Sequence, residues 1–247
     1  MVDRRTTVKI TIDGVEVDAY SDETILEAAR RVGITIPNLC FLEGLSVWGG
    51  CRLCVIEIAE DPRIRPACAT TVVPDMEVLV NTPRLRAYRK AILEMLFAEG
   101  NHVCSVCVAN GNCELQDMAV FCGMDHIRYD AQNPKLEIDA SHPKFIFDPN
   151  RCILCSRCVR VCHEIEGAHV WDIARRGAES RMITGLNQPW GEVASCTWCG
   201  KCVAACPTGA LSYQGKAVGE MVHTADMIRR LAIARKTGEW LEPEAEE

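Results

Sequence analysis

Hydrophobic and polar residues alternate at the start of the chain in a pattern that predicts a β-hairpin. Apolar side chains occupy every second position over residues 8–12 and again over residues 15–19, and Asp13-Gly14 stands between these two runs. Asp-Gly between alternating runs is a strong signal for the two-residue turn of a hairpin. We therefore expect the chain to open with two antiparallel strands.

Apolar residues at helical spacing predict three helices. The first is expected to start at a Ser21 cap and to end at Gly33. The second opens with Thr82 as its cap and Pro83 at its first helical position, and the third follows Thr224. The apolar faces of these helices are expected to consist of Ile25, Ala28, Ala29 and Val32 in the first, Leu85, Tyr88, Ile92, Met95 and Leu96 in the second, and Met227, Ile228 and Leu231 in the third.

Short strands and a connector are predicted between the second and third helices. Residues 145–147 and 182–185 have the composition of strands, and prolines mark the polar segment that precedes them. Together these elements predict an α+β chain of several small domains, which suits a length of 247 residues. The predicted domains are residues 1–81, 82–142 and 143–215, followed by a helix and an acidic tail over residues 216–247.

Cysteine usage changes this picture, because the chain contains 16 cysteines. Its 27 Lys and Arg residues against 34 Asp and Glu residues give a net charge of −7, without the basic stretches of nucleic-acid-binding proteins. No apolar run reaches membrane-spanning length, and Arg4-Arg5 is not followed by the apolar region of an export signal. We therefore expect a cytoplasmic protein with reduced thiols, no nucleic-acid partner and no membrane insertion, in which the cysteines bind metal clusters.

Two cysteine runs of identical spacing, C-x2-C-x2-C-x3-C, lie 44 positions apart at residues 152–162 and 196–206. Two-cluster bacterial ferredoxins use such runs to hold two [4Fe–4S] clusters, and the last cysteine of each run ligates the cluster of the other run. A zinc ribbon uses two C-x2-C pairs and has no role for the third and fourth cysteines. The sequence therefore predicts one [4Fe–4S] cluster on Cys152, Cys155, Cys158 and Cys206, and a second on Cys196, Cys199, Cys202 and Cys162.

Four earlier cysteines, spaced C-x10-C-x2-C-x13-C, are predicted to hold a [2Fe–2S] cluster with two thiolates on each iron. Plant-type ferredoxins have four residues in the first gap, so the ten residues here are a departure. Gly49-Gly50 precedes the central pair and would let backbone N–H groups approach the cluster sulfurs. Zinc on the same thiols is the alternative, but the preceding hairpin and helix match a ferredoxin-like β-grasp domain. The predicted ligands are Cys40, Cys51, Cys54 and Cys68.

The segment after the second helix contains candidate ligands of a third [4Fe–4S] cluster, in what would be a small helical domain. Cys104, Cys107 and Cys113 supply three thiolates, and a fourth ligand is needed. His102 and Cys122 are the two candidates for it. A neutral imidazole in place of a thiolate would make the cluster less negative and raise its reduction potential, as histidine does in Rieske centres.

Sequence motifs for substrate chemistry are absent from the chain. It contains no G-x-G-x-x-G fingerprint, no G-x4-G-K-[ST] phosphate loop and no C-x3-C-x2-C run. We therefore expect an electron-transferring chain that has no catalytic site of its own and binds neither flavin nor nucleotide. The remaining histidines are expected at the surface or in packing, and they are His126, His142, His163, His169 and His223.

The order of these motifs resembles the N-terminal electron-transfer module of the large iron–sulfur subunit of respiratory complex I, of FeFe hydrogenases and of NAD-linked molybdenum formate dehydrogenases. In those relatives a long catalytic domain follows, whereas this sequence ends soon after Cys206. With NHVCSVCVANGNCELQD in its middle, the chain most resembles the small diaphorase subunits of NAD-reducing, bidirectional NiFe hydrogenases.

That resemblance implies a β-grasp [2Fe–2S] domain, a [4Fe–4S] cluster held by His102 and three cysteines, and a ferredoxin-like domain with two [4Fe–4S] clusters. It also implies partners, namely a flavin subunit that handles NAD(H) and the small and large subunits of a NiFe hydrogenase. In complex I and the FeFe enzymes the histidine lies four positions before the first cysteine, whereas His102 lies two before Cys104. An equivalent relay of a formate dehydrogenase or complex I-like assembly is the nearest alternative, and a zinc-stabilised interaction module is an alternative of another class.

Overall fold

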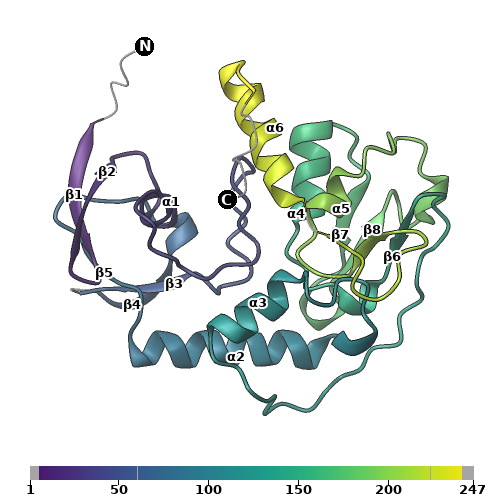
Figure 1. Cartoon of the computed structure of the whole chain (residues 1–247), viewed down its shortest axis with the longest axis horizontal. Helices are drawn as coiled ribbons and strands as arrows, with labels where there is room; N and C mark the ends of the chain where they lie inside the picture. The colour runs from purple at the N-terminus through teal and green to yellow at the C-terminus, as the bar shows by residue number, and fades with distance from the viewer. Residues whose placement is uncertain (1–5, 60, 223, 241–247) are drawn as a thin grey trace. The chain divides into compact units, whose positions relative to one another are not determined.

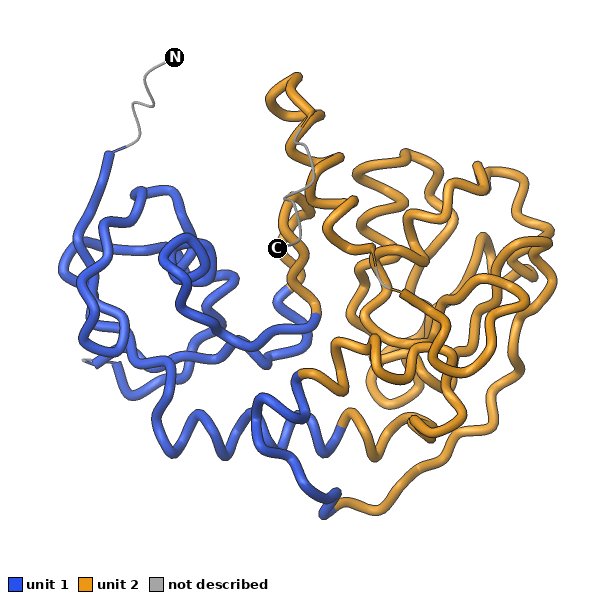
Figure 2. Tube along the Cα trace, in the orientation of Figure 1, with its two compact units in different colours: residues 1–39, 49–95, 118–128 blue, residues 40–48, 96–117, 129–247 orange. Residues whose placement is uncertain are grey.

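The computed structural model of the chain contains two compact units (Figure 1; Figure 2). The residues that the structure describes are 6–59, 61–222 and 224–240. His223 and the acidic tail from residue 241 therefore lie outside the described residues. The first unit comprises residues 1–39, 49–95 and 118–128, and the second comprises residues 40–48, 96–117 and 129–247.

The first unit contains a mixed five-stranded sheet with one helix packed on it, which is the arrangement of a β-grasp fold, together with residues 83–95 and 118–121 of two further helices (Figure 1). Its elements are β1 (Thr7–Ile12), β2 (Val15–Tyr20), α1 (Ile25–Arg31), β3 (Val55–Ile58), β4 (Asp61–Pro66) and β5 (Glu77–Leu79). The strand order is β2-β1-β5-β3-β4, in which β1 and β5 are parallel and the other neighbours antiparallel. Helix α1 buries four apolar side chains, Ile25, Leu26, Ala28 and Ala29.

The predicted hairpin is present at the start of this unit. Ile12 pairs with Val15, and the two turn residues between them have left-handed φ angles of 47° at Asp13 and 82° at Gly14. Two consecutive left-handed residues form the turn type that Asp-Gly favours in hairpins. The Asp13 carboxylate also accepts a 2.8 Å hydrogen bond from the Val80 amide, which fastens the turn to the chain that follows β5.

Helix α1 begins later than the sequence pattern predicts. Thr24 is its N-cap, because the Thr24 hydroxyl accepts a 3.3 Å hydrogen bond from the Glu27 amide while the Glu27 carboxylate accepts one of 2.9 Å from the Thr24 amide. This reciprocal arrangement is a capping box, and it satisfies two amides that a cap at Ser21 would leave open. The predicted Ser21 cap is therefore wrong, and Val32 caps the C-terminus instead of joining the buried face.

Helix α2 (Pro83–Glu99) begins as predicted, since the Thr82 hydroxyl accepts a 3.2 Å hydrogen bond from the Leu85 amide. Its predicted apolar face is only partly correct. Tyr88 and Met95 are exposed, whereas Arg89, one turn after Leu85, is buried. The buried face of the helix therefore has a charged residue, Arg89, between Leu85 and Leu93.

Arg89 can be buried because each of its three guanidinium nitrogens donates a hydrogen bond to a backbone carbonyl group. It donates hydrogen bonds to the carbonyl oxygens of Leu53, Val55 and Val80, at 3.3, 2.7 and 2.7 Å. Burial lowers the pKa of Arg89, and the carbonyl acceptors compensate the cost of removing this cation from water. Since Leu53 and Val55 flank Cys54, Arg89 also fixes the backbone that carries this predicted ligand.

The second unit is built from short helices and two antiparallel strand pairs, β6 with β9 and β7 with β8 (Figure 1). The strands predicted at residues 145–147 and 182–185 correspond to β6 and β8. Its regular elements are β6 (Phe145–Phe147), α4 (Arg157–Arg160), a π-helical segment (Val161–Glu166), β7 (Trp171–Ala174), β8 (Arg181–Thr184), α5 (Lys201–Ala205), β9 (Leu211–Tyr213) and α6 (Ala225–Thr237). Helix α3 (Glu114–Phe121) begins in this unit and ends in the first. Short 3-10 turns of the second unit lie at Cys104–Val106, Pro149–Arg151, Gly177–Glu179 and Trp190–Glu192, and the first unit has one at Ala67–Ala69.

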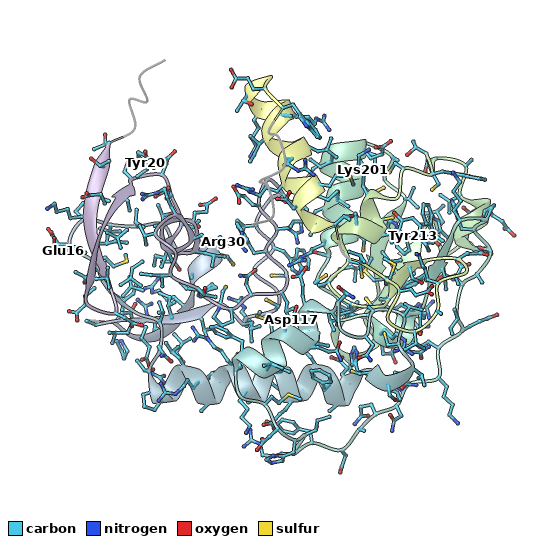
Figure 3. The ribbon with its side chains drawn as sticks, in the orientation of Figure 1. Glu16, Tyr20, Arg30, Asp117, Lys201 and Tyr213 are labelled. Atoms are coloured by element: carbon cyan, nitrogen blue, oxygen red, sulfur yellow. The ribbon has the colours of Figure 1, made fainter. Side chains whose placement is uncertain are left out.

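Aromatic side chains form the core around the strand pairs of the second unit. The Trp190 ring stacks on Phe145 at a centroid distance of 5.2 Å and meets Trp171 edge-on at 4.8 Å. Phe147 contacts Trp171 edge-on at 5.1 Å. Tyr213, labelled in Figure 3, adds a ring contact of 5.5 Å to Phe145 from β9. These rings enclose one side of the cysteine runs described below.

Helix α6 follows Thr224 and stops at Gly238, as predicted, and it packs onto the segment of residues 40–48 within the second unit. Gly44 allows this approach, because a Cβ atom there would lie 2.2 Å from the Cβ of the buried Ala232. Arg229 of α6 pairs with Glu43 at 3.0 Å. Among the described residues, no helix is long and apolar enough to cross a membrane.

Candidate metal centres

The two cysteine runs share an unusual backbone conformation. Leu154 and Ser156 of the first run have φ angles of 51° and 56°, and the residues 44 positions later, Trp198 and Gly200, have φ angles of 60° and 72°. Left-handed backbone is costly for residues with a side chain and is retained where the surrounding structure needs it. Here it turns amides toward sulfur, since the Leu154 N–H donates to Cys152 Sγ at 3.4 Å. The sequence pattern alone gave no sign of this conformation at Leu154 or Trp198.

The first-repeat cavity is lined by Cys152, Cys155, Cys158 and Cys206. Three of these cysteines belong to the first run, and Cys206 comes from the end of the second. Apolar side chains such as Phe147, Met182 and Leu211 complete the wall. Burial raises the pKa of Cys155 to about 11, so its sulfur becomes a thiolate at neutral pH only when a metal stabilises the charge.

The second-repeat cavity is lined by Cys162, Cys196, Cys199 and Cys202. Its wall includes Phe145, Trp171 and Trp190. The Val170 amide donates to Cys162 Sγ at 3.3 Å. The last cysteine of each run thus lies with the first three of the other run, which is the exchange that the sequence spacing predicts.

The middle cavity brings together His102, Cys104, Cys107 and Cys113. Nε2 of His102 is buried and has no hydrogen-bond partner among the described residues, which a metal ligand would explain. Burial, assisted by the charge of Arg151, lowers the pKa of His102 to about 4, so its imidazole is neutral and able to bind a metal. Cys122 follows α3 in the first unit and is not among the residues that line this cavity.

Gly209 limits the size of the middle cavity. A Cβ atom at this position would lie 2.5 Å from Cys107 Sγ and 3.4 Å from the Cβ of Ala109. Any side chain at position 209 would therefore push against a candidate ligand. The sequence pattern did not single out Gly209, because the glycine stands in a Pro-Thr-Gly-Ala turn like many others.

Gly209→Ala is therefore expected to displace Cys107 and to remove the EPR signal of the middle cluster from the dithionite-reduced chain, while the other cluster signals remain. Overpacking of this kind costs about 1–3 kcal/mol, so the chain is expected to fold. Ala178→Ser, which adds one heavy atom at an exposed position of the same unit, is the control. A full middle-cluster signal in Gly209→Ala would show that the cavity accommodates a Cβ atom at position 209, which contradicts the close contact with Cys107.

Two arginines of α4 hold the loops of the second unit in place. Arg157 is buried and forms a bidentate pair with Glu114 at 2.6 and 2.8 Å, while also donating to the Phe41 carbonyl at 2.9 Å. Arg160 donates to the Ser46 carbonyl at 2.6 Å and to the carbonyl of Cys155 at 3.3 Å. Both cations thereby fasten the segment of residues 40–48 to the first cysteine run.

The four cysteines predicted to hold the [2Fe–2S] cluster are distributed over both units. Cys51, Cys54 and Cys68 belong to the first unit, and Cys54 and Cys68 are buried there. Cys40 is the first residue of the segment 40–48 of the second unit, and its carbonyl oxygen accepts a hydrogen bond from Arg160. Gly49, two residues before Cys51, has a φ angle of 65°, in the left-handed region that favours glycine.

The geometry of the three cavities fits polynuclear clusters. Each cavity is lined by four candidate ligands that come from different parts of the chain. The ligands of one zinc ion would all lie about 2.0–2.3 Å from a single point. Within the described residues, no group of three or more His, Cys, Asp or Glu side chains converges in that way.

Three protein-family models match successive parts of the chain. Residues 5–83 match a 2Fe-2S iron–sulfur cluster binding domain. Residues 89–128 match the NADH-ubiquinone oxidoreductase-G iron–sulfur binding region, and residues 143–212 match the ferredoxin-like domain of NADH-quinone oxidoreductase subunit 3. The prediction of a multi-domain α+β iron–sulfur protein is therefore confirmed.

Individual proteins are similar over most of the chain. One subunit of an NADH-quinone oxidoreductase of Rhizobium meliloti is 38% identical over 83% of the chain, and one subunit of the NADP-reducing hydrogenase of Solidesulfovibrio fructosivorans is 36% identical over 82%. The chain spans only 24% and 35% of the length of these two relatives. A chain in the crystal structure of an NAD+-reducing [NiFe]-hydrogenase in its H2-reduced state is 35% identical, with a TM-score of 0.82, and the match covers 94% of this chain and 98% of that one.

Proposed function

Because this chain belongs to the family of iron–sulfur electron-transfer subunits that includes the matched chain of the NAD+-reducing [NiFe]-hydrogenase, we propose a specific place for it in such an enzyme. It relays electrons between a flavin subunit that handles NAD(H), the diaphorase part, and the small and large subunits of a NiFe hydrogenase. The overall reaction would be the reduction of NAD+ by hydrogen, in the cytoplasm.

The observation that carries this proposal is the grouping of candidate ligands in the second unit. Each of three separate cavities is lined by four of these candidate ligands. We assign one [4Fe–4S] cluster to each cavity and a [2Fe–2S] cluster to Cys40, Cys51, Cys54 and Cys68. Bound clusters of these types supply one-electron redox couples. The chain itself contributes the ligands, the apolar and aromatic side chains beside them, and the amides that point at sulfur. It binds no flavin and no nucleotide.

The test is anaerobic purification of the tagged chain from its host, followed by an assay of the co-purified complex for hydrogen-dependent reduction of NAD+. We expect activity in the wild-type complex, and a fall of at least about tenfold in a Cys199→Ser complex whose [2Fe–2S] signal is intact, because changes near metal ligands typically cost 10–100-fold. Unchanged turnover in Cys199→Ser would contradict the relay.

An equivalent relay in a formate dehydrogenase or a complex I-like assembly is the second candidate. The similarity to the NADH-quinone oxidoreductase of Rhizobium meliloti favours it, since the identity of 38% is as high as that to the hydrogenase chains. A co-purified complex that responds to formate or quinone, and not to hydrogen, would select this alternative while leaving the iron–sulfur assignments in place.

A further inference from the structure

His142 is a buried histidine beside the second-repeat cavity that is not one of the proposed ligands. It lies directly before β6 and is 0% exposed. Its ring stacks on Phe145 at a centroid distance of 4.6 Å and contacts Trp190 at 4.9 Å and Trp198 at 4.8 Å. The space between these three aromatic side chains would by itself accept any flat ring. The two nitrogens, however, need hydrogen-bond partners in a buried site.

The hydrogen bonds of His142 fix the position of its proton. The backbone N–H of Lys144 donates to Nδ1 at 3.1 Å, so Nδ1 is the acceptor and carries no proton. Since Nδ1 accepts this bond, the proton of the imidazole is carried by the other ring nitrogen, Nε2. Nε2 lies 3.9 Å from Cys196 Sγ. The Nε2–H group therefore donates and the sulfur accepts.

We propose that His142 is a positioning residue of the second-repeat cluster, whose Nε2–H hydrogen bond to Cys196 Sγ raises the reduction potential of that cluster. The inference rests on the proposed relay function. Reduction adds negative charge that is shared by the ligand sulfurs, and a donor aimed at one of them stabilises the reduced form more than the oxidised form. The aromatic wall strengthens this effect because it keeps the local dielectric constant low.

A second donor at the same cavity supports this electrostatic role. The Trp171 side chain forms a hydrogen bond with Cys202, and both residues line this cavity. In the first repeat, Cys152 occupies the position equivalent to Cys196 and accepts from the backbone amide of Leu154. The donor at Cys196 is instead a side chain, so the hydrogen bond to the second cluster depends on which residue occupies position 142.

Two of the charged groups near this cavity form an ion pair with each other. Glu166, which lines the cavity, forms an ion pair with Lys201 of α5, labelled in Figure 3. The ammonium group of Lys144 lies over the Trp198 ring, 5.8 Å from its centroid. Replacement of His142 by another residue without charge therefore changes the hydrogen bond to Cys196 and leaves the paired charges in place.

Two substitutions separate the hydrogen bond from the packing. His142→Phe keeps a flat ring in the aromatic slot and removes the donor. His142→Gln loses the ring but presents an amide N–H at nearly the distance of Nε2 from the backbone. His126→Phe, at an exposed histidine of the first unit, is the matched control.

The experiment is a potentiometric titration, followed by EPR, of the full chain in its anaerobically purified complex. The second-repeat cluster is identified as the signal that disappears in Cys196→Ala. We expect a more negative midpoint potential for this cluster alone in His142→Phe, a value close to wild type in His142→Gln, and no change in His126→Phe. An unchanged potential in His142→Phe would overturn the proposal, as would an equal shift in His142→Gln, which would assign the effect to packing.

If His142→Phe fails to assemble the cluster, His142→Gln carries the test: a potential near that of wild type supports the hydrogen bond, and a shifted one overturns it. The potential is measured without turnover. A complex that lacks hydrogen-dependent NAD+ reduction would therefore contradict the proposed function and still report on His142.

Discussion

Cys206→Ala is expected to destroy the cluster held by Cys152, Cys155 and Cys158, although Cys206 belongs to the other cysteine run. The structure places Cys206 at the first-repeat cavity, and burial raises the pKa of the Cys206 thiol there, as it does that of Cys155. Loss of one of four ligands exceeds the loss of an outer hydrogen bond to a ligand, which already costs about 10–100-fold at a metal site. Hydrogen-dependent NAD+ reduction by the complex is expected to fall by more than that factor.

The reciprocal variant supplies the control for Cys206→Ala. Cys162→Ala is expected to remove the cluster of Cys196, Cys199 and Cys202, and to leave the first-repeat cluster intact. EPR spectra of the two reduced variants should therefore lack different signals, each belonging to the run that was not mutated. If each substitution abolished the cluster of its own run, the exchange of ligands between the runs would be wrong.

His102→Ala is expected to eliminate the [4Fe–4S] signal of the middle cluster, whereas Cys122→Ala is expected to preserve it. His102 lines the middle cavity with Cys104, Cys107 and Cys113, and its neutral imidazole has a buried Nε2 without a hydrogen-bond partner in the described part of the chain. Cys122 follows α3 in the first unit and is not part of the wall. EPR of the dithionite-reduced variants measures the difference. If the signal were lost in Cys122→Ala and kept in His102→Ala, Cys122 would be the ligand.

A substitution of His102 by another ligand extends this test. His102→Cys would restore a metal-binding side chain but would replace a neutral ligand by a thiolate. We expect the middle cluster to assemble with a more negative potential, because each added negative charge disfavours reduction. A potential equal to that of wild type would mean that residue 102 does not touch the cluster.

Local signals in the sequence predicted the elements whose formation depends on a few neighbouring residues. Asp13-Gly14 defined the hairpin because few residue pairs adopt two left-handed conformations in succession. The cap of α1 was misplaced, because Ser21 and Thr24 are both suitable capping residues and only Thr24 has Glu27 at the right spacing. The buried face of α2 was predicted incompletely, since its central residue, Arg89, is stabilised by carbonyl groups from distant loops.

The residues of the candidate sites likewise fall into those that sequence spacing predicts and those that depend on contacts in the folded chain. Ligand spacing grouped Cys152 to Cys206 because the exchange of the fourth cysteine follows from the spacing of the motif itself. The choice between His102 and Cys122 depends on how α3 and the preceding loop are placed, and no spacing rule determines that. His142 and Gly209 act through contacts with residues about 50 and 100 positions away, Cys196 and Cys107, so only the folded chain reveals them.

Mössbauer spectroscopy of the ⁵⁷Fe-labelled full chain, purified anaerobically and analysed for iron, zinc and acid-labile sulfide, tests the four-cluster relay most directly. We expect iron and sulfide for one [2Fe–2S] and three [4Fe–4S] clusters per chain, with every cluster reduced and reoxidised reversibly. A colourless protein with zinc on its cysteines, or a chain with fewer than three [4Fe–4S] clusters after full reconstitution, would contradict the relay.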